Sequence, residues 1–171
     1  MILSRRPPDF VIGDPEAPYL LRWYLIPRNR WFNVYLHKFL RSDEDRALHD
    51  HPWWWVSLIL RGRYLEHTPS DTFLRRAWRP RWGRATALHR VELFRARVCT
   101  TVRTPDQNGI CRTRHSFSDA RSMEAVWTIF ITGPRVREWG FACPNGWRHW
   151  RDFCGVREDG TNSGTTGRGC A

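Results

Sequence analysis

The stretch HDHPWWWVSLILRG, residues 49–62, decides the fold. Its second half, WVSLILRG (55–62), is an apolar run that ends in glycine, which is typical of a buried strand. Its first half places His49 and His51 directly before that strand. Residues two apart in an extended chain point to the same face, so we expect both imidazoles on one side and Asp50 on the other. Such a pair either chelates a divalent metal or only fills the core.

Similar strand-like runs, rich in β-branched and aromatic residues and separated by turn residues, extend along the chain. They cover residues 20–26, 31–40, 63–67, 72–78, 84–94, 126–132 and 136–141. The segment RPRWG (79–83) reads as a turn, and the best helix candidate is the short WRHWRDF (147–153). A chain of 171 residues suits one domain, and many short strands predict an all-β sandwich or barrel with a short peripheral helix.

Two regions do not fit a compact sheet. Residues 96–125 are polar and rich in arginine, and they read as a long loop or insertion within the domain. Such a segment is either a flap over one barrel mouth or a plain surface excursion. The Gly/Ser/Thr-rich residues 155–171 predict a flexible C-terminal tail, which leaves residues 1–154 as the single domain.

The formal net charge of +11 is compatible with an anionic partner such as nucleic acid. However, Lys38 is the only lysine, and the arginines are scattered along the chain. This bias is typical of GC-rich coding, so nucleic acid is a disfavoured partner that the charge alone does not exclude. No apolar run approaches the ~20 residues of a membrane span, and the first residues lack the apolar stretch of a signal peptide. We therefore expect a soluble, cytoplasmic protein with no membrane partner.

The five cysteines form an odd, irregularly spaced set. Without a secretion signal they predict free thiols rather than a disulfide framework. Cys99, Cys111 and His115 could form a zinc cluster, but their spacing matches no common zinc pattern. Cys143 is expected to be structural, because no histidine is placed by sequence to activate it.

The spacing around His51 resembles the first motif of the cupin superfamily. That motif has His-x-His, then Glu four residues after the second His, then Gly seven residues further on. Here the Glu position is Trp55 and the Gly position is Gly62. The second cupin motif, a Pro and Gly turn followed by His, is similar to residues 79–83 followed by His89. The resemblance covers roughly residues 31–141.

The segment WGFACPNGW (139–147) also resembles uncharacterised cupin-domain proteins of bacteria and their phages. The resemblance implies a double-stranded β-helix, or jelly-roll barrel. It further implies a metal held by His49, His51 and His89, with coordination positions left open for water, substrate or dioxygen. The ion would be Fe(II) by preference, or Mn, Ni, Zn or Co, since the affinity order alone cannot choose among them.

The tryptophan at position 55 puts the fourth, carboxylate ligand of the cupin pattern in doubt. Glu92 and Glu66 are possible substitutes, although Glu92 lies three residues beyond His89 and would need a bulge to turn inward. Metal-bound histidines also need acceptors for their second ring nitrogens. Asp50, Glu66 and Glu92 are the acidic candidates for that role, and the sequence does not rank them.

Strand alternation places Trp53, Trp55 and Ser57 on the same face as the histidines, and with Tyr64 they are the predicted walls of a substrate pocket. The alternative for the indoles is simple core filling. Arg135 and Arg137 would share one face of a strand and could clamp an anionic substrate bidentately. The alternative for them is an exposed, solvated strand.

Three functions remain open on this basis. The first is a metal-dependent enzyme that acts on a small, possibly anionic substrate, dioxygenase-like with iron and isomerase- or lyase-like with zinc or manganese. The second is a non-catalytic cupin that binds a small ligand. The third is a basic protein that binds nucleic acid. By analogy with other small barrels, a homodimer is expected.

Overall fold

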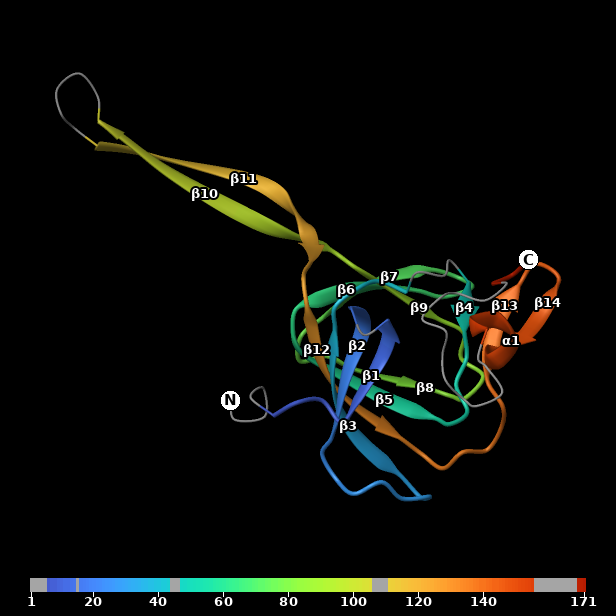
Figure 1. Cartoon of the computed structure of the whole chain (residues 1–171). Coiled ribbons are helices and arrows are strands. Elements are labelled where there is room, and N and C mark those ends of the chain that lie inside the picture. The colour runs from blue at the N-terminus through green and yellow to red at the C-terminus, as the bar shows by residue number, and fades with distance from the viewer. Residues whose placement is uncertain (1–5, 15, 44–46, 106–110, 156–168) are drawn as a thin grey trace.

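The computed structural model describes residues 6–14, 16–43, 47–105, 111–155 and 169–171. Its strands close into a barrel from which one long hairpin projects (Figure 1). One wall is a six-stranded sheet in the order β1-β2-β3-β12-β5-β8, whose neighbouring strands are all antiparallel. These strands are β1 (Phe10–Asp14), β2 (Ala17–Tyr24), β3 (Asn33–Phe39), β5 (Trp55–Arg61), β8 (Pro80–Gly83) and β12 (Val126–Thr132).

Two three-stranded sheets complete the barrel, in the orders β7-β6-β9 and β14-β13-β4. Their strands are β4 (Leu48–His49), β6 (Arg63–His67), β7 (Thr72–Arg76), β9 (Arg90–Leu93), β13 (Gly140–Cys143) and β14 (Gly146–His149). The helix α1 (Trp150–Cys154) follows β14 at the edge of the barrel. The predicted all-β barrel with a short peripheral helix is confirmed.

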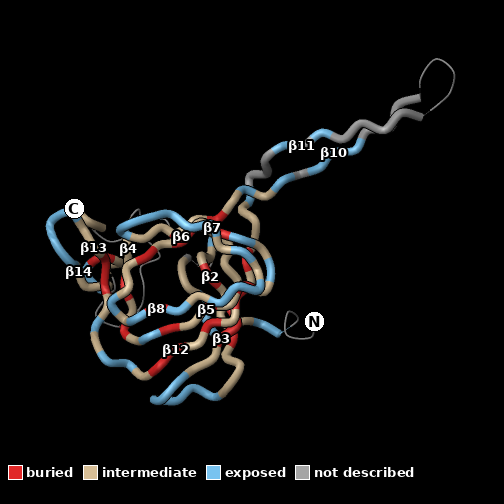
Figure 2. The backbone as a smooth tube through the Cα atoms, turned by 180° about the vertical axis from the view of Figure 1, so that it is seen from behind, coloured by how far each residue is buried: buried red, intermediate tan, exposed pale blue. Residues whose placement is uncertain are grey.

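Alternation of burial along the central strands builds the core. In β5 and β12 every second residue is buried, as expected for strands with one face against the interior. Buried Ile59 and Val126 of the six-stranded sheet meet Tyr64, Val91 and Leu93 of β6 and β9. Figure 2 shows the buried residues concentrated inside the barrel.

The turn between β5 and β6 depends on a glycine. Gly62 has φ of +88°, a conformation that L side chains rarely adopt, and a Cβ there would lie 3.0 Å from the Val126 side chain. Gly62 is the glycine of the cupin motif. It is the one residue between β5 and β6, and it lets the chain pass directly from the six-stranded sheet into β6.

Residues 96–125 were predicted to be a long loop or insertion. Those that the structure describes lie almost entirely in a projecting hairpin of β10 (Arg95–Pro105) and β11 (Cys111–Met123), which are paired along their length. The hairpin extends away from the barrel and covers neither mouth (Figures 1 and 2). A polar ribbon can be regular because its backbone hydrogen bonds are satisfied across the pair, with no buried face to produce an apolar alternation in the sequence.

The register of this hairpin excludes the zinc cluster of Cys99, Cys111 and His115. Cys99 is opposite Phe117, whereas Cys111 is opposite Pro105, six residues further along β10. At ~3.3 Å per residue the two cysteine positions lie roughly 20 Å apart along the ribbon.

The prediction that all cysteines are free thiols is wrong. Cys143 of β13 forms a disulfide with Cys170, and the Arg148 guanidinium donates to the carbonyl oxygen of Gly169 at 2.6 Å. The end of the chain is therefore fastened to β13 and β14. Residues 156–168, on which most of the predicted flexible tail falls, lie outside the described residues.

Two strand assignments also differ from the prediction. The expected turn 79–83 contains β8, an edge strand that begins at Pro80, where a missing backbone N–H costs no interior hydrogen bond. The expected strand 136–141 begins only at Gly140, because the preceding residues cross the 52–54 segment, with the Val136 N–H donating to the Pro52 carbonyl. No helix within the described ranges is long and apolar enough to cross a bilayer.

Candidate metal centre

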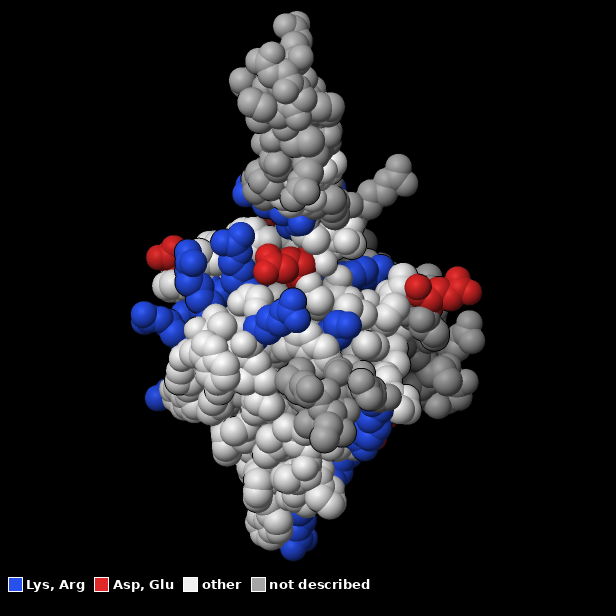
Figure 3. Space-filling model, turned by 90° about the vertical axis from the view of Figure 1, so that its left-hand side faces the viewer, with Lys and Arg blue, Asp and Glu red and all other residues white. Residues whose placement is uncertain are grey.

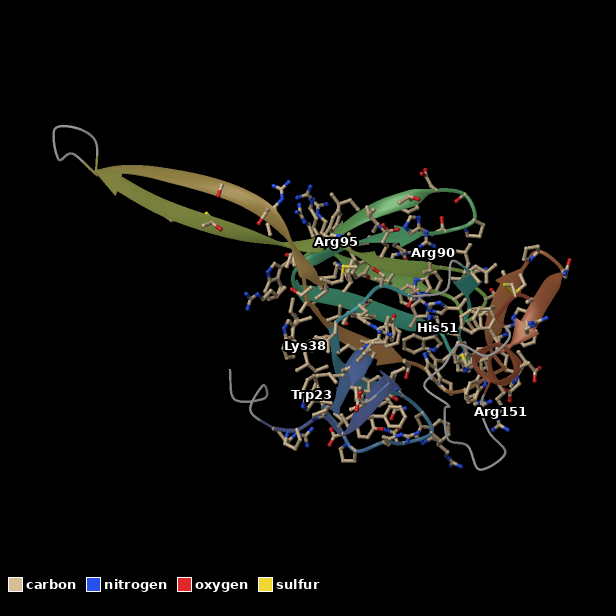
Figure 4. The ribbon with its side chains drawn as sticks, turned by 45° about the horizontal axis from the view of Figure 1, so that its top comes forward. Trp23, Lys38, His51, Arg90, Arg95 and Arg151 are labelled. Carbon is tan, nitrogen blue, oxygen red and sulfur yellow. A yellow bond between two sulfur atoms is a disulfide. The ribbon has the colours of Figure 1, made fainter. Side chains whose placement is uncertain are left out.

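Three histidines meet inside one end of the barrel. His49 lies in β4, His51 follows it by two residues, and His89 immediately precedes β9. One ring nitrogen from each histidine lies within 4.8 Å of the others. Figure 4 shows the labelled His51 among the side chains between the sheets. The grouping expected from the sequence is therefore present in the fold.

Backbone hydrogen bonds hold this arrangement. The His49 N–H donates to the His89 carbonyl at 2.9 Å, and the His89 N–H donates to the His49 carbonyl at 2.9 Å. The His51 N–H donates to the Ala85 carbonyl, also at 2.9 Å. Two residues distant in sequence are thus direct antiparallel partners, which places their side chains next to each other.

The side chain of His89 is oriented by Glu66 of β6. The Glu66 carboxylate accepts from Nδ1 of His89 at 2.9 Å, and its other oxygen accepts from Nε of Arg75 at 2.7 Å and Nε of Arg81 at 2.9 Å. Burial opposes ionisation of Glu66, but the hydrogen bond from His89 and the bond and charge of Arg81 outweigh it and lower the carboxyl pKa to about 2. Glu66 is therefore an acceptor at neutral pH, and Nδ1 of His89 must carry the proton.

This tautomer leaves the lone pair of His89 Nε2 pointing into the cluster, where it lies 2.8 Å from Nε2 of His51. Burial lowers the pKa of His51 well below its ordinary value, and the neighbouring imidazoles lower it further. Burial likewise lowers the pKa of His49 to about 4, although the negative charge of Asp43 opposes this. Imidazoles that converge in this way are the donor set that borderline divalent cations prefer, so the residues fit a metal ion.

A fourth carboxylate ligand is absent from this cluster within the described residues. Glu92 accepts from Nε2 of His67 at 2.8 Å and its side chain is 44% exposed, so its expected alternative role as a ligand is wrong. Glu66 supports His89 from outside the cluster instead of binding beside it. Of the three acidic residues left unranked by the sequence, Glu66 is the one that orients a histidine. Asp50 faces away and accepts from the Gly140 N–H, the Trp147 indole and Arg137.

Trp55 takes the place of the cupin glutamate and fills that side of the site. Its indole is 1% exposed and stacks on the His89 ring with centroids 4.7 Å apart. A Cβ at Gly83 would lie 2.4 Å from the indole, so only glycine fits there. The tryptophan thus replaces a possible ligand by an aromatic wall.

The predicted pocket residues Trp53, Ser57 and Tyr64 divide into two groups. Trp53 packs against Trp55 and Phe130 at the histidine end of the core, and Ser57 is buried. Tyr64 belongs to the hydrophobic cluster of Ile59 and Val91, and burial is the main cause that raises its pKa to about 12. Trp53 and Ser57 therefore lie where they could form the wall of a substrate pocket, whereas Tyr64 is part of the hydrophobic core.

Arg135 and Arg137 do not form the predicted clamp. Arg135 is exposed and pairs with Glu138, whereas Arg137 pairs with Asp50 on the outer side of β4. Both guanidinium groups are neutralised, and the segment that carries them is not a strand. The physical reason is that the carboxylates of Asp50 and Glu138, which sequence reasoning did not connect to them, already hold these arginines.

Sequence reasoning missed a different cation, Arg22 of β2. Its Nε donates to Nε2 of buried His37 at 2.9 Å, and its guanidinium lies 4.7 Å from the centroid of the Tyr35 ring. Burial lowers the Arg22 pKa, and no carboxylate among the described residues pairs with it. The available signal was one charged residue between Leu20 and Tyr24, on the inner face of a strand that is otherwise apolar.

The interior next to Arg22 also contains polar atoms without partners. The side-chain atoms His37 Nδ1, Thr128 Oγ1 and Trp55 Nε1 are buried and make no hydrogen bond to any residue that the structure describes. Buried polar atoms are nearly always satisfied, so each of these calls for a partner from outside the chain. His37 and Thr128 are opposite one another in the β3–β12 register, and the Phe130 ring stacks on both His37 and Trp55. A polar interior therefore continues from the three histidines to Arg22.

Comparison with solved structures places this architecture in the cupin fold. A cupin-2 domain protein of Rhodospirillum rubrum is similar with a TM-score of 0.51 and 10% identity, covering 80% of this chain and 76% of that protein. A protein of Klebsiella pneumoniae with a double-stranded β-helix domain has 11% identity, a TM-score of 0.44 and coverage of 78% and 90%. The DMSP lyase DddQ of Ruegeria pomeroyi has 9% identity, a TM-score of 0.46 and coverage of 79% and 57%.

No family model and no curated protein sequence matches the chain. The likeness is thus one of fold: the chain has a cupin fold, as the resemblance of its first motif implied. Its particular chemistry has to be argued from its own residues.

Proposed function

We propose that this protein is a metal-dependent cupin enzyme that acts on a small anionic substrate. The observation that carries the proposal is the convergence of three ring nitrogens, from His49, His51 and His89, which lie within 4.8 Å of one another. Three protein ligands leave coordination positions for water and substrate, which is the pattern of catalytic rather than closed structural metal sites. Among the candidate ions Fe(II) is favoured, with Mn, Ni, Zn or Co as alternatives.

Bound iron would supply oxygenase-type chemistry, because it can activate dioxygen next to a coordinated substrate. Zinc or manganese would instead act as a Lewis acid and support isomerase- or lyase-like reactions. The chain's own groups fulfil the other requirements. Glu66 fixes the tautomer and ring orientation of His89, and the Trp55 indole excludes water from one side.

Arg22 is the proposed anchor for the negative charge of the substrate, in place of Arg135 and Arg137. It is the cation on the inner face of the barrel that lacks a carboxylate partner among the described residues, and its planar guanidinium suits a carboxylate or phosphate. The unpartnered atoms of His37 and Thr128 beside it offer further hydrogen bonds. A substrate with one anionic end and one metal-binding end fits this arrangement.

Metal analysis of protein purified without a histidine tag tests the site. We expect close to one transition-metal ion per chain, and loss of that ion in His51→Ala. The matched control is His67→Ala, which removes a histidine that bonds Glu92 and Thr72 outside the cluster and should leave the metal content unchanged. A full metal content in His51→Ala would contradict the site.

Oxygen consumption by the iron-loaded protein separates the enzyme from its alternatives. A set of small carboxylates and phosphates would be screened for uptake of dioxygen above the rate of the His51→Ala variant. A non-catalytic cupin would bind such a ligand, measured by calorimetry, without turnover. Loss of ligand binding in Arg22→Gln, with metal content retained, would assign the anionic end to Arg22.

A further inference from the structure

A second functional surface lies at the foot of the projecting hairpin, outside the barrel. A cavity of about 1190 Å³ opens there between β9, the start of β10 and the end of β11. Four arginines line it, namely Arg63, Arg90, Arg95 and Arg97. Figure 3 views the molecule from this side and shows Lys and Arg side chains gathered around the foot of the hairpin, and Figure 4 labels Arg90 and Arg95 there.

Two of these arginines are compensated and two are not. Arg90 lies 3.5 Å from the Glu92 carboxylate, and Arg63 lies 3.9 Å from that of Glu124. Arg95 and Arg97 are exposed, and among the described side chains neither forms an ion pair, although Asp119 is opposite Arg97 in the register of the hairpin. Positive charge that is not neutralised internally is available to an anionic partner.

The composition of the ribbon indicates what kind of partner this is. Residues 95–123 contain six arginines and two acidic residues, and their large apolar side chains are limited to Val98, Val102, Ile110, Phe117 and Met123. An arm that binds a second protein subunit would be expected to present an apolar face. A polar, strongly basic arm is suited to a phosphate backbone.

The shape of the ribbon agrees with this chemistry. Its two paired strands, of 11 and 13 residues, extend well clear of the barrel (Figure 1). At ~3.3 Å per residue the shorter strand spans roughly 35 Å. The major groove of B-DNA admits a two-stranded β-ribbon, whereas the major groove of A-form RNA is too narrow and deep for one.

We propose that the β10–β11 ribbon binds double-stranded DNA, with Arg95 and Arg97 at its foot contacting the phosphate backbone. The six arginines and two acidic residues of 95–123 contribute +4 to the net charge of +11. The contacts of Arg95 and Arg97 would be to phosphates, which carry no sequence information, so their contribution to binding would be independent of sequence and strongly dependent on salt. The proposal is independent of the metal centre.

Fluorescence anisotropy with a random 24-base-pair DNA duplex, over a series of salt concentrations, tests the proposal. The variant is Arg95→Gln/Arg97→Gln, and the matched control is Arg28→Gln/Arg30→Gln, which removes the same charge from the exposed β2–β3 loop at the opposite end of the barrel (Figure 1). Loss of two phosphate contacts should lower the slope of log K against log salt by about 1.8. At 0.1 M salt this corresponds to a loss of affinity of roughly 60-fold, while the control stays near wild type.

The other outcomes overturn the proposal in distinct ways. Absence of measurable duplex binding by the wild-type protein at 50 mM salt would refute DNA as the partner. Equal losses in both variants would show that only the net charge matters and refute the ribbon as the surface. Equal affinity for an RNA duplex would refute the groove argument. A dimer that dissociates in the Arg95→Gln/Arg97→Gln variant, measured by analytical ultracentrifugation without a change in the salt slope, would assign the ribbon to self-association instead.

Discussion

Replacement of Glu66 by glutamine should weaken metal binding without abolishing the fold. Glutamine keeps the shape of the side chain but loses the charge that holds three donors, those of His89, Arg75 and Arg81. Its amide could accept from His89 Nδ1 but would turn an NH2 group toward a guanidinium. Outer partners of metal-bound histidines typically contribute 10–100-fold to metal affinity, so we expect a rise in the metal Kd within that range, or about 1.4–2.7 kcal/mol.

The stability cost follows from the exposure of the same groups. Removing one partner of a fully buried ion pair costs roughly 3–5 kcal/mol, but the two arginine side chains are 27% and 30% exposed and can regain water. We therefore expect a loss of about 2 kcal/mol for the metal-free protein, which lowers Tm by roughly 4–8 °C for a chain of this size.

Competition with a coloured chelator measures the metal Kd, and calorimetry of metal-free protein measures Tm. The matched control is Glu92→Gln, which removes a carboxylate from a histidine outside the cluster and should alter neither quantity by a comparable amount. A Glu66→Gln variant with lowered Tm but wild-type metal affinity would refute the reasoning, because Glu66 would then stabilise the sheet without orienting His89.

Three further outcomes are expected. The pKa of Glu66 in the folded protein, about 2, lies below its ordinary value of 4.5, so the contribution of Glu66 to stability is complete above pH 4.5 and is lost as the pH falls toward 2. The free energy of unfolding of metal-free protein, measured in urea, should therefore fall by on the order of 3 kcal/mol over this window. In Glu66→Gln the free energy of unfolding should depend less on pH. Thiol titration of the denatured protein should find two more thiols after reduction than before it, because Cys143 and Cys170 are joined; an equal number before and after reduction would contradict this bond. Gly83→Ala should destabilise the protein by roughly 1–3 kcal/mol in chemical denaturation, because its Cβ would lie 2.4 Å from the Trp55 indole; an unchanged midpoint would contradict this packing.

The barrel and the histidine pair were predictable because both depend on local spacing. Alternation in WVSLILR predicts a strand with one buried face, and the same period of two puts His49 and His51 on one side. The pairing of His49 with His89 was not predictable from spacing, since it depends on which strands become neighbours. The cupin resemblance supplied that information.

The wrong predictions for the arginine clamp and for the cysteines both involve side chains whose partners are far away in the sequence. Nothing local to Arg137 reveals that Asp50 holds it, and nothing local to Cys143 reveals that Cys170 returns to meet it. The long hairpin was missed because a ribbon with no buried face leaves no hydrophobic period to detect. Arg22 was detectable in principle, as a charge on the inner face of an apolar strand, but only the structure identifies that face as the barrel interior.

The reciprocal backbone bonds between His49 and His89 have a consequence for the choice of ion. These bonds fix the backbone from which two of the three imidazoles project, which limits how far the spacing of the ring nitrogens can adapt to ionic radius. A stiff set of nitrogens discriminates poorly between Fe(II), Co(II) and Zn(II), whose sizes are similar, and occupancy then follows intrinsic affinity and the supply of each metal. The same polypeptide produced in different media would carry different ions, and its reactivity would vary with them.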